Sequence, residues 1–353
     1  MLVLAMVSLR IGYAAQSHNM QHPADRRRLV YWAQRKGHEI VLDLEQKTDV
    51  TVLSGRADFA FWSQKKDSGP IILDLIDGYL GNEKPLKDWS RGVGKVLAGQ
   101  VGGRPRPYRD IVAEVCSVAS AVICASPEQR ETILPYCSNT HVIMDFHEEF
   151  PMLAKQDRKT NSGTNLMWEG FPFTAKGLLM LREALTEISK SRPLGLRLVT
   201  DLRYPRLLGR YFYSDTQKII ENIPQILGEG LKTSEWSVDE VVRTAKESDI
   251  SVLPLDPKGA LNPLKPEGRL LIMWRLGLPC LVSPTLAYDR VMKQAGIDGI
   301  CLTPEDWQSK ILELMDSENL RNDIAERGQQ YIRDNHSEAR TLGLWDKLFE
   351  SVL

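Results

Sequence analysis

The sequence lacks the features of a disulfide-stapled scaffold, a membrane-spanning protein and a disordered chain. Its 353 residues contain only five cysteines, an odd number with no C-x-x-C pair, which predicts reduced core thiols. No apolar run is long enough to cross a bilayer; residues 1–9 are apolar but lack a basic flank, which favours a buried strand. The net charge is only −1, from 45 basic and 46 acidic residues, which argues against a surface built to bind nucleic acid.

What is present is an ordinary globular composition, with 42% hydrophobic and 26% charged residues. At about 150 residues per domain, the length predicts two domains. Polar residues with little apolar periodicity follow Phe150, and we expect a linker there. The predicted parts are residues 1–150, residues 151–330 and a C-terminal helical segment over residues 331–353.

Short apolar runs alternate with amphipathic stretches in both halves. This alternation predicts two Rossmann-like, doubly wound α/β domains that face a cleft, with ligands at the carboxyl ends of parallel strands. The expected strands of the first half are 2–8, 38–42, 50–53, 59–62, 71–75, 121–124 and 141–144, with helices at 25–36, 109–117 and 127–134. Those of the second half are 165–168, 195–200, 231–234, 250–255 and 279–282, with helices at 178–191, 216–226, 238–247 and 267–276. We expect Asp25 to cap the first helix, Gly37 to end it, and Ser126-Pro127 to begin the third.

Two segments of the second half have the composition of phosphate-binding loops. In Asn262-Pro-Leu-Lys-Pro-Glu-Gly-Arg269, between a strand and a helix, unpaired backbone N–H groups beside Lys265 and Arg269 predict a diphosphate site. In Gly170-Phe-Pro-Phe-Thr-Ala-Lys176-Gly177, the first glycine lets a ligand approach the strand end and Lys176 can meet a phosphate. The alternatives are a capped helix with solvated charges and an ordinary surface lysine.

Together these segments resemble the nucleotide-sugar-binding domain of GT-B glycosyltransferases, especially glycosyltransferase family 4 (group 1). Gly170, Lys176 and Gly177 resemble the family's G-R-x-x-x-x-K-G loop, and residues 245–254 resemble its A-x-x-A-D-V-x-V-x-P strand. Residues 265–279 resemble its donor-site helix ending in G-x-P-V, and residues 119–126 resemble A-D-x-V-x-x-x-S in the first half. The C-terminal helix is also typical, and it implies a return of the chain towards the N-terminal domain.

The chain departs from this pattern at several positions. Phe171 stands where the family has arginine, and Ser120 replaces an aspartate. The family's E-x7-E pair, which contacts the donor sugar and the ribose, falls on Leu264 and Ile272. Glu267 is a candidate for one of the two missing roles, and the identity of the donor is open.

The resemblance implies a hexosyltransferase-type enzyme without metal or other cofactor. It would transfer a sugar from a nucleotide diphosphate donor to a carbohydrate or lipid-linked acceptor. The donor-binding residues would be Gly170, Lys176, Asn262, Lys265, Glu267 and Arg269. A non-catalytic protein that binds nucleotide sugar or a partner enzyme is the alternative, favoured by the missing glutamates, and an epimerase or phosphorylase is a third.

The first half is expected to hold the acceptor. Asp77 follows the predicted strand 71–75 and is the candidate base if the reaction inverts configuration; otherwise it positions the sugar or merely opens a turn. His22 and Arg26 lie in or next to the long loop after the first strand and are expected to contact the acceptor, with a solvated helix face over residues 26–28 as the alternative. The spacing of Asp145, His147 and Glu149 fits hinge hydrogen bonds better than a metal site.

A basic segment lies between Lys84 and Arg109, where seven of the eight charged residues are basic. We expect a mobile loop that meets an anionic acceptor or a membrane surface, with a solvated loop as the alternative. Together these features predict a cytoplasmic protein, with peripheral contact at the inner face of the membrane as one interpretation and no nucleic-acid partner.

Overall fold

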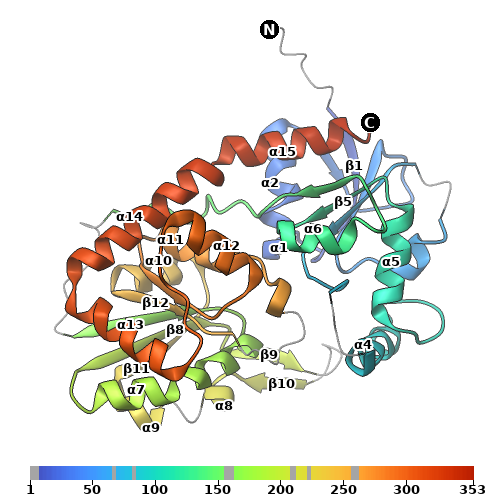
Figure 1. Ribbon diagram of the computed structural model, residues 1–353. Helices are drawn as coiled ribbons and strands as arrows, with labels where there is room; N and C mark the ends of the chain where they lie inside the picture. The colour runs from blue at the N-terminus through green and yellow to red at the C-terminus, as the bar shows by residue number, and fades with distance from the viewer. Residues whose placement is uncertain are drawn as a thin grey trace, which may run out of the picture. The chain divides into compact units, whose positions relative to one another are not determined.

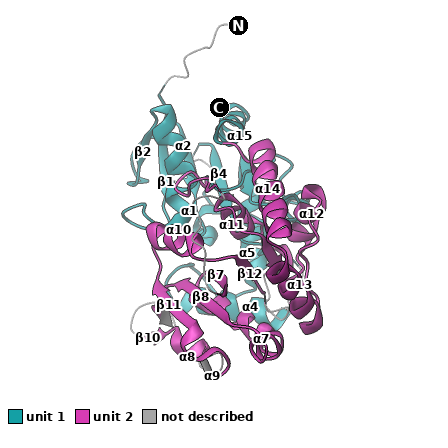
Figure 2. Cartoon of the chain, turned by 90° about the vertical axis from the view of Figure 1, so that its left-hand side faces the viewer, with its two compact units in different colours: residues 1–146, 338–353 teal, residues 147–337 magenta. Residues whose placement is uncertain are grey.

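The computed structural model describes residues 8–65, 69–81, 85–154, 163–206, 212–220, 224–255 and 262–353 (Figure 1). The chain divides into two compact units, residues 1–146 with 338–353, and residues 147–337 (Figure 2). The division after Phe146 falls close to the linker expected from Phe150 onward. The last helix belongs to the first unit.

The first unit is built on six parallel strands in the spatial order β2-β1-β3-β4-β5-β6. The strands are β1 (Arg10–Ala14), β2 (Glu39–Val41), β3 (Val50–Leu53), β4 (Ile71–Leu75), β5 (Ala121–Cys124) and β6 (Thr140–Val142). The helices are α1 (Pro23–Arg26), α2 (Leu29–Lys36), α3 (Phe59–Trp62), α4 (Pro85–Leu97), α5 (Tyr108–Val118), α6 (Pro127–Ile133) and α15 (Glu338–Glu350). Strands β3, β4 and β5 are buried at every position, as expected for a parallel sheet covered on both faces.

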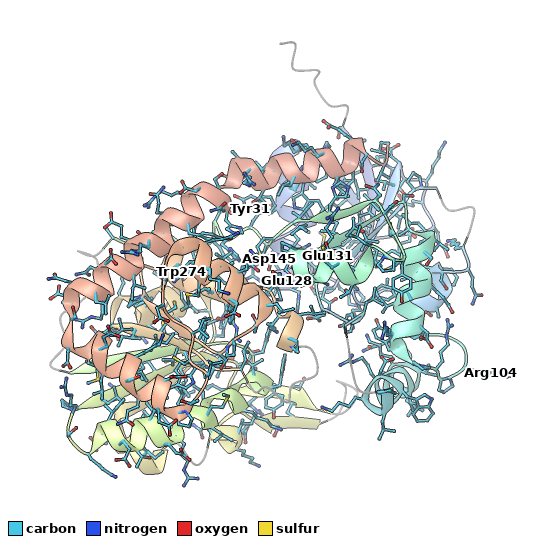
Figure 3. The ribbon with its side chains drawn as sticks, viewed as in Figure 1. Tyr31, Arg104, Glu128, Glu131, Asp145 and Trp274 are labelled. Carbon is cyan, nitrogen blue, oxygen red and sulfur yellow. The ribbon has the colours of Figure 1, made fainter. Side chains whose placement is uncertain are left out.

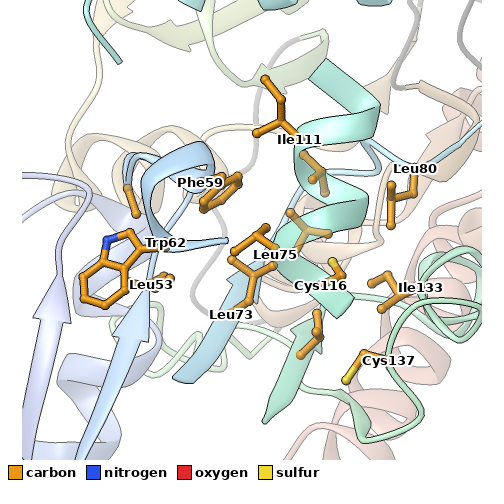
Figure 4. Close-up of a cluster of buried hydrophobic side chains, with 14 of the residues drawn as sticks. Leu53, Phe59, Trp62, Leu73, Leu75, Leu80, Ile111, Cys116, Ile133 and Cys137 are labelled. Carbon is orange, nitrogen blue, oxygen red and sulfur yellow. The ribbon is translucent and has the colours of Figure 1, made fainter. Parts of the chain in front are cut away.

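Two hydrophobic clusters cover the faces of this sheet. In one, Phe59 of α3 and Ile111 of α5 pack with strand residues such as Leu73 (Figure 4). In the other, Trp32 of α2 stacks on Phe349 of α15 with ring centroids 4.2 Å apart. Helix α15 therefore completes the core of the first unit, as the predicted return of the C-terminal helix requires.

The second unit contains a five-stranded parallel sheet in the order β11-β8-β7-β12-β13. Its strands are β7 (Thr164–Glu169), β8 (Leu194–Thr200), β11 (Leu231–Glu235), β12 (Ile250–Leu253) and β13 (Cys280–Val282). Its helices are η2 (Pro172–Leu181), α7 (Arg182–Ser189), α8 (Gln217–Ile220), α9 (Pro224–Leu227), η3 (Gly228–Gly230), α10 (Val238–Lys246), η4 (Asn262–Leu264), α11 (Gly268–Arg275), α12 (Leu286–Ala295), α13 (Pro304–Asp316) and α14 (Glu318–Asn335). An antiparallel pair, β9 (Arg203–Arg206) and β10 (Phe212–Asp215), follows β8.

Helices lie on both sides of the second sheet. Figure 1 shows α7, α8 and α9 on one side and α10 and α11 on the other. Helix α14 packs on α11 so closely that a Cβ on Gly328 would lie 2.4 Å from the indole of Trp274, which Figure 3 labels. Both units thus have the predicted doubly wound α/β architecture.

The structure corrects several predicted elements. Residues 59–62 form helix α3 rather than a strand, with the Asp58 side chain accepting a hydrogen bond from Phe61 N; a four-residue apolar run does not reveal its period. The predicted helix 25–36 is divided between α1 and α2, and its cap is His22 rather than Asp25. The predicted strand 2–8 lies almost wholly outside the described residues. The left-handed Gly37 and the Ser126 cap are confirmed.

Candidate functional site

The loop after β7 lies at the topological switch point of the second sheet. The chain leaves the central strand β7 towards β8, and the later strand β12 pairs on its other side. Ligands of open α/β sheets bind where the connections diverge in this way, at the carboxyl ends of the strands. The loop packs closely on the end of β12, because a Cβ on Gly177 would lie 2.3 Å from Pro254 O.

Arg269, in the first turn of α11, approaches the backbone at the end of β7. Its Nη1 donates a hydrogen bond of 3.1 Å to Glu169 O, and a Cβ on Gly170 would lie 2.6 Å from the same nitrogen. The structure therefore brings together two of the residues predicted from separate segments. Burial raises the pKa of Tyr288, whereas the neighbouring Arg269 guanidinium acts in the opposite direction.

The other residues predicted to bind the donor have different surroundings. Lys176 is exposed on η2, and Lys265 is half-buried just before α11. Glu267 is buried at the N-cap of α11, and its Oε1 accepts a hydrogen bond of 2.9 Å from Arg290 Nη2. Asn262 begins η4, but its side chain lies outside the described residues.

Sequence reasoning missed a carboxylate at the same strand end. Glu169 is buried, and its Oε1 accepts a hydrogen bond of 2.8 Å from the indole Nε1 of Trp236, which follows β11. At the end of β8, burial and the nearby Glu235 raise the pKa of Asp201. The signal that could have found them was their position in the sequence, since all four residues end or follow a strand of the same sheet.

Asp77 lies in the bend after β4 in the first unit. Its Oδ2 accepts a hydrogen bond of 3.0 Å from the hydroxyl of Tyr79, whose pKa burial and the Asp77 charge raise. The buried amide of Gln129 donates to the backbone oxygens of Leu75 and Asp77, at 2.7 and 2.9 Å. The bend is therefore held rigidly at the carboxyl end of its strand, and the catalytic role of Asp77 stays a prediction.

The polar residues at the start of α1 support the backbone. His22 Nδ1 accepts a hydrogen bond of 3.1 Å from Ala24 N, and burial lowers the pKa of this histidine. Arg26 Nη1 donates a hydrogen bond of 2.7 Å to Gln21 O. Both residues thus shape the loop in which the acceptor contacts were predicted.

The solvated helix face that we considered for residues 26–28 is wrong for its last two members, because Arg27 and Arg28 are both buried. Arg28 is fully buried and binds both oxygens of Asp74, at 2.6 and 2.8 Å, and Asp145 at 2.8 Å. Burial opposes its charge, but the two carboxylates raise the pKa of Arg28 above its ordinary value. This ion pair ties α2 to β4 and to the segment after β6.

The mobile loop expected between Lys84 and Arg109 is also wrong, since residues 85–97 form α4. A Cβ on Gly92 would lie 1.8 Å from Arg106 O, so the helix and the returning chain are in direct contact. Lys95 lies over the ring of Tyr108 at 4.7 Å from its centroid, and Arg106 pairs with Glu114. Several of the basic side chains of this segment therefore contact other residues of the first unit.

Apolar side chains lie on the outer face of α4 instead. Leu86, Trp89 and Leu97 are 79%, 49% and 71% exposed, and their spacing places them on one face of the helix. Exposed Lys87 and Arg104 lie nearby in the sequence, and Figure 3 shows Arg104 at the outer edge of the first unit. Helix α4 is therefore amphipathic, and apolar side chains lie on its exposed face.

No metal-binding group of three or more His, Cys, Asp or Glu side chains occurs among the described residues. The five cysteines are buried and free of disulfides, as predicted. Across the described chain, no helix has the length and apolar content needed to cross a membrane.

Two Rossmann-like units with the last helix returned to the first define the GT-B fold, and this is the fold of the chain. Among solved structures it is similar to WaaG, a glycosyltransferase involved in lipopolysaccharide biosynthesis (TM-score 0.60, 11% identity, 96% of this chain and 98% of that one). It is also similar to a glycosyltransferase from Rickettsia africae (TM-score 0.64, 11% identity, 98% of both chains). A third similar structure is TarM (TM-score 0.61, 12% identity, 85% of this chain), of whose length the match spans about half, 54%. Neither a family model nor a curated protein matches the sequence.

Proposed function

We propose that the chain is a glycosyltransferase that transfers a sugar, of hexose type, from a nucleotide diphosphate donor to a carbohydrate or lipid-linked acceptor. The observation that carries the proposal is the Arg269 guanidinium at the backbone of Gly170, at the switch point of a GT-B fold. The second unit binds the donor and the first binds the acceptor. The reaction requires no metal ion, and the protein acts in the cytoplasm.

In this reaction the acceptor hydroxyl oxygen forms a bond to the anomeric carbon, and the bond from that carbon to the diphosphate oxygen breaks. The diphosphate departs with the bonding electrons. Lys176, Lys265, Arg269 and the N-terminus of α11 stabilise its charge. Asp77 takes the hydroxyl proton in an inverting reaction; in a retaining one it positions the sugar, and the proton passes to the departing diphosphate oxygen. Asn262 and Glu267 complete the proposed donor site.

The acceptor side of the proposal includes His22 and Arg26. Both stay predicted acceptor contacts, in addition to their role in shaping the loop. Replacing His22 by Asn retains a capping acceptor and removes the second ring nitrogen, so it tests the acceptor contact with little change to the helix.

The test of the proposed function is Arg269→Ala in a nucleotide-release assay with a panel of nucleotide sugars and acceptors. We expect turnover to fall by roughly 10- to 100-fold or more, the usual loss for one donor that stabilises a developing charge. Arg243→Ala is the matched control, because Arg243 lies on the exposed face of α10 and pairs only with Glu240 and Glu247 of its own surface in the described structure. Unchanged turnover in a folded Arg269→Ala variant contradicts the assignment.

The non-catalytic alternative is favoured by one specific feature of the chain. Phe171 replaces the arginine of the family loop, and Leu264 and Ile272 occupy the positions of its two glutamates. A chain that binds nucleotide sugars, raising its melting temperature, but releases no nucleotide with any acceptor supports this alternative.

We further propose that the outer face of α4 contacts an anionic membrane surface. Exposed Leu86, Trp89 and Leu97 supply apolar area, and Lys87 and Arg104 supply positive charge. Trp89→Asp should reduce co-sedimentation with vesicles that contain anionic lipid, whereas Val118→Asp, at an exposed apolar position on α5, should not. Equal sedimentation of both variants and the wild type contradicts membrane contact through α4.

A further inference from the structure

A cavity opens at the switch point of the first sheet. Strand β1 pairs with β2 on one side and with β3 on the other, so the loops after β1 and β3 diverge. The cavity has a volume of about 180 Å³, and Tyr13, Ser17, His18, Leu42 and Arg56 are among the residues that line it. They come from the carboxyl ends of β1, β2 and β3, which is where ligands of such sheets bind.

A buried carboxylate fixes the loop that forms one wall. Asp25 is fully buried and accepts hydrogen bonds from Tyr13 OH, Gln16 N, Ser17 N and Ser17 Oγ, at 2.6, 2.7, 2.9 and 2.8 Å. Ser17 Oγ also accepts a hydrogen bond from His22 N. The hydroxyls of Tyr13 and Ser17 therefore form hydrogen bonds within the protein, and these bonds hold the loop in place without a ligand.

The side chains that remain to meet a ligand are basic. Arg56 is exposed, and its Nη1 donates a hydrogen bond of 3.0 Å to Gln16 O, which holds the guanidinium beside the loop. His18 is exposed and also lines the cavity. No carboxylate lines the cavity in the described structure, and nearby Asp58 is used to cap α3 and to accept from Gly102 N.

We propose that this cavity binds an anionic group, a phosphate or a carboxylate, through Arg56 and His18. A guanidinium offers paired N–H donors that match both groups, the imidazole of His18 offers a further N–H donor, and no carboxylate of the lining repels an anion. Assigning the group to the sugar acceptor rests on the proposed function; the anion site itself does not. The acceptor is then an anionic molecule, whose charged group the first unit recognises.

The test is calorimetric titration of the full chain with inorganic phosphate and, separately, with acetate. All variants carry Lys176→Ala and Arg269→Ala, so that the proposed diphosphate site does not contribute. We expect Arg56→Ala to weaken anion binding at least tenfold, and Arg56→Lys to weaken it less because one charge remains. Arg340→Ala, which removes an exposed arginine from α15, is the matched control and should change nothing. Melting curves establish that each variant is folded.

Binding of either anion that depends on Arg56 supports the site. Tighter binding of phosphate or of acetate then shows whether the site recognises a phosphate or a carboxylate group. Anion binding that survives Arg56→Ala, or that Arg340→Ala weakens equally, overturns it. Nucleoside diphosphate binding, measured without the two donor-site substitutions, should be unaffected by Arg56→Ala. If no nucleoside diphosphate binds but the Arg56 dependence persists, the proposed function fails while the anion site stands.

Discussion

Replacing Gly170 by Ala tests whether the approach of Arg269 to the end of β7 builds the donor site. The added Cβ would lie 2.6 Å from Arg269 Nη1, 3.0 Å from Thr174 Oγ1 and 3.1 Å from Trp168 Cζ2. The guanidinium is the end of a flexible side chain, so it moves while the fold is kept. Its charge-assisted hydrogen bond to a diphosphate, worth about 1.5–3 kcal/mol, is then lost. That loss weakens nucleoside diphosphate binding by roughly 10- to 150-fold.

Calorimetric titration with the best-binding nucleoside diphosphate measures this change. Gly170→Ala in the Arg269→Ala background should have little further effect, because both substitutions act through one guanidinium. Gly163→Ala, at the opposite end of β7, is the matched control, since its Cβ would meet only Pro193, at 3.3 Å or more. Unchanged affinity in the folded Gly170→Ala variant, or fully additive effects with Arg269→Ala, would refute the reasoning.

Four further predictions concern the stability of the chain. Arg28→Met leaves the buried carboxyl group of Asp74 without its ion-pair partner in the core, so urea unfolding should show a loss of about 3–5 kcal/mol. Trp345→Ala opens a cavity beneath α15 and should cost about 3–5 kcal/mol, whereas Leu353→Ala, at an exposed site, should leave the melting temperature unchanged. Because burial holds the pKa of His22 below its ordinary 6.5, the unfolded chain binds the proton first, and stability should fall as the pH drops through that value; His22→Asn should reduce this slope in urea midpoints. Burial raises the pKa of all five thiols, so at neutral pH they should react with a thiol reagent only as fast as the chain opens, and rapid labelling of any one in the folded chain contradicts this.

The elements that the sequence predicted well are those whose signals are local. Strand β3 has the predicted bounds Val50–Leu53, because a short β-branched run bounded by polar residues favours a buried strand. The cap at Ser126 and the stop at Gly37 depend only on neighbouring residues. The two segments that carry the proposed donor residues were also chosen from sequence, because strand ends and helix starts mark where ligands bind in α/β sheets; their role stays a prediction.

The errors concern residues whose state depends on distant partners. Arg28 belongs to a run of three arginines, and its burial depends on Asp74 and Asp145, which lie 46 and 117 positions further along the chain. Asp25 was expected to cap a helix, but it instead holds the loop after β1. The basic side chains of residues 84–109 suggested a loop in solvent, yet the ammonium group of Lys95 packs on the ring of Tyr108.

The sequence by itself determined the class of the fold and most of its alternating strands and helices, because hydrophobic period and helix caps are properties of adjacent residues. It also located Gly170 and Arg269 as candidate site residues. Only the tertiary structure decided that these two meet at one strand end, that α15 completes the first unit, and that Arg56 rather than the earlier arginines lines the cavity at β1 and β3. The reason is physical: which charges are buried, paired or exposed depends on contacts between segments far apart in the chain, and a local pattern does not contain those contacts.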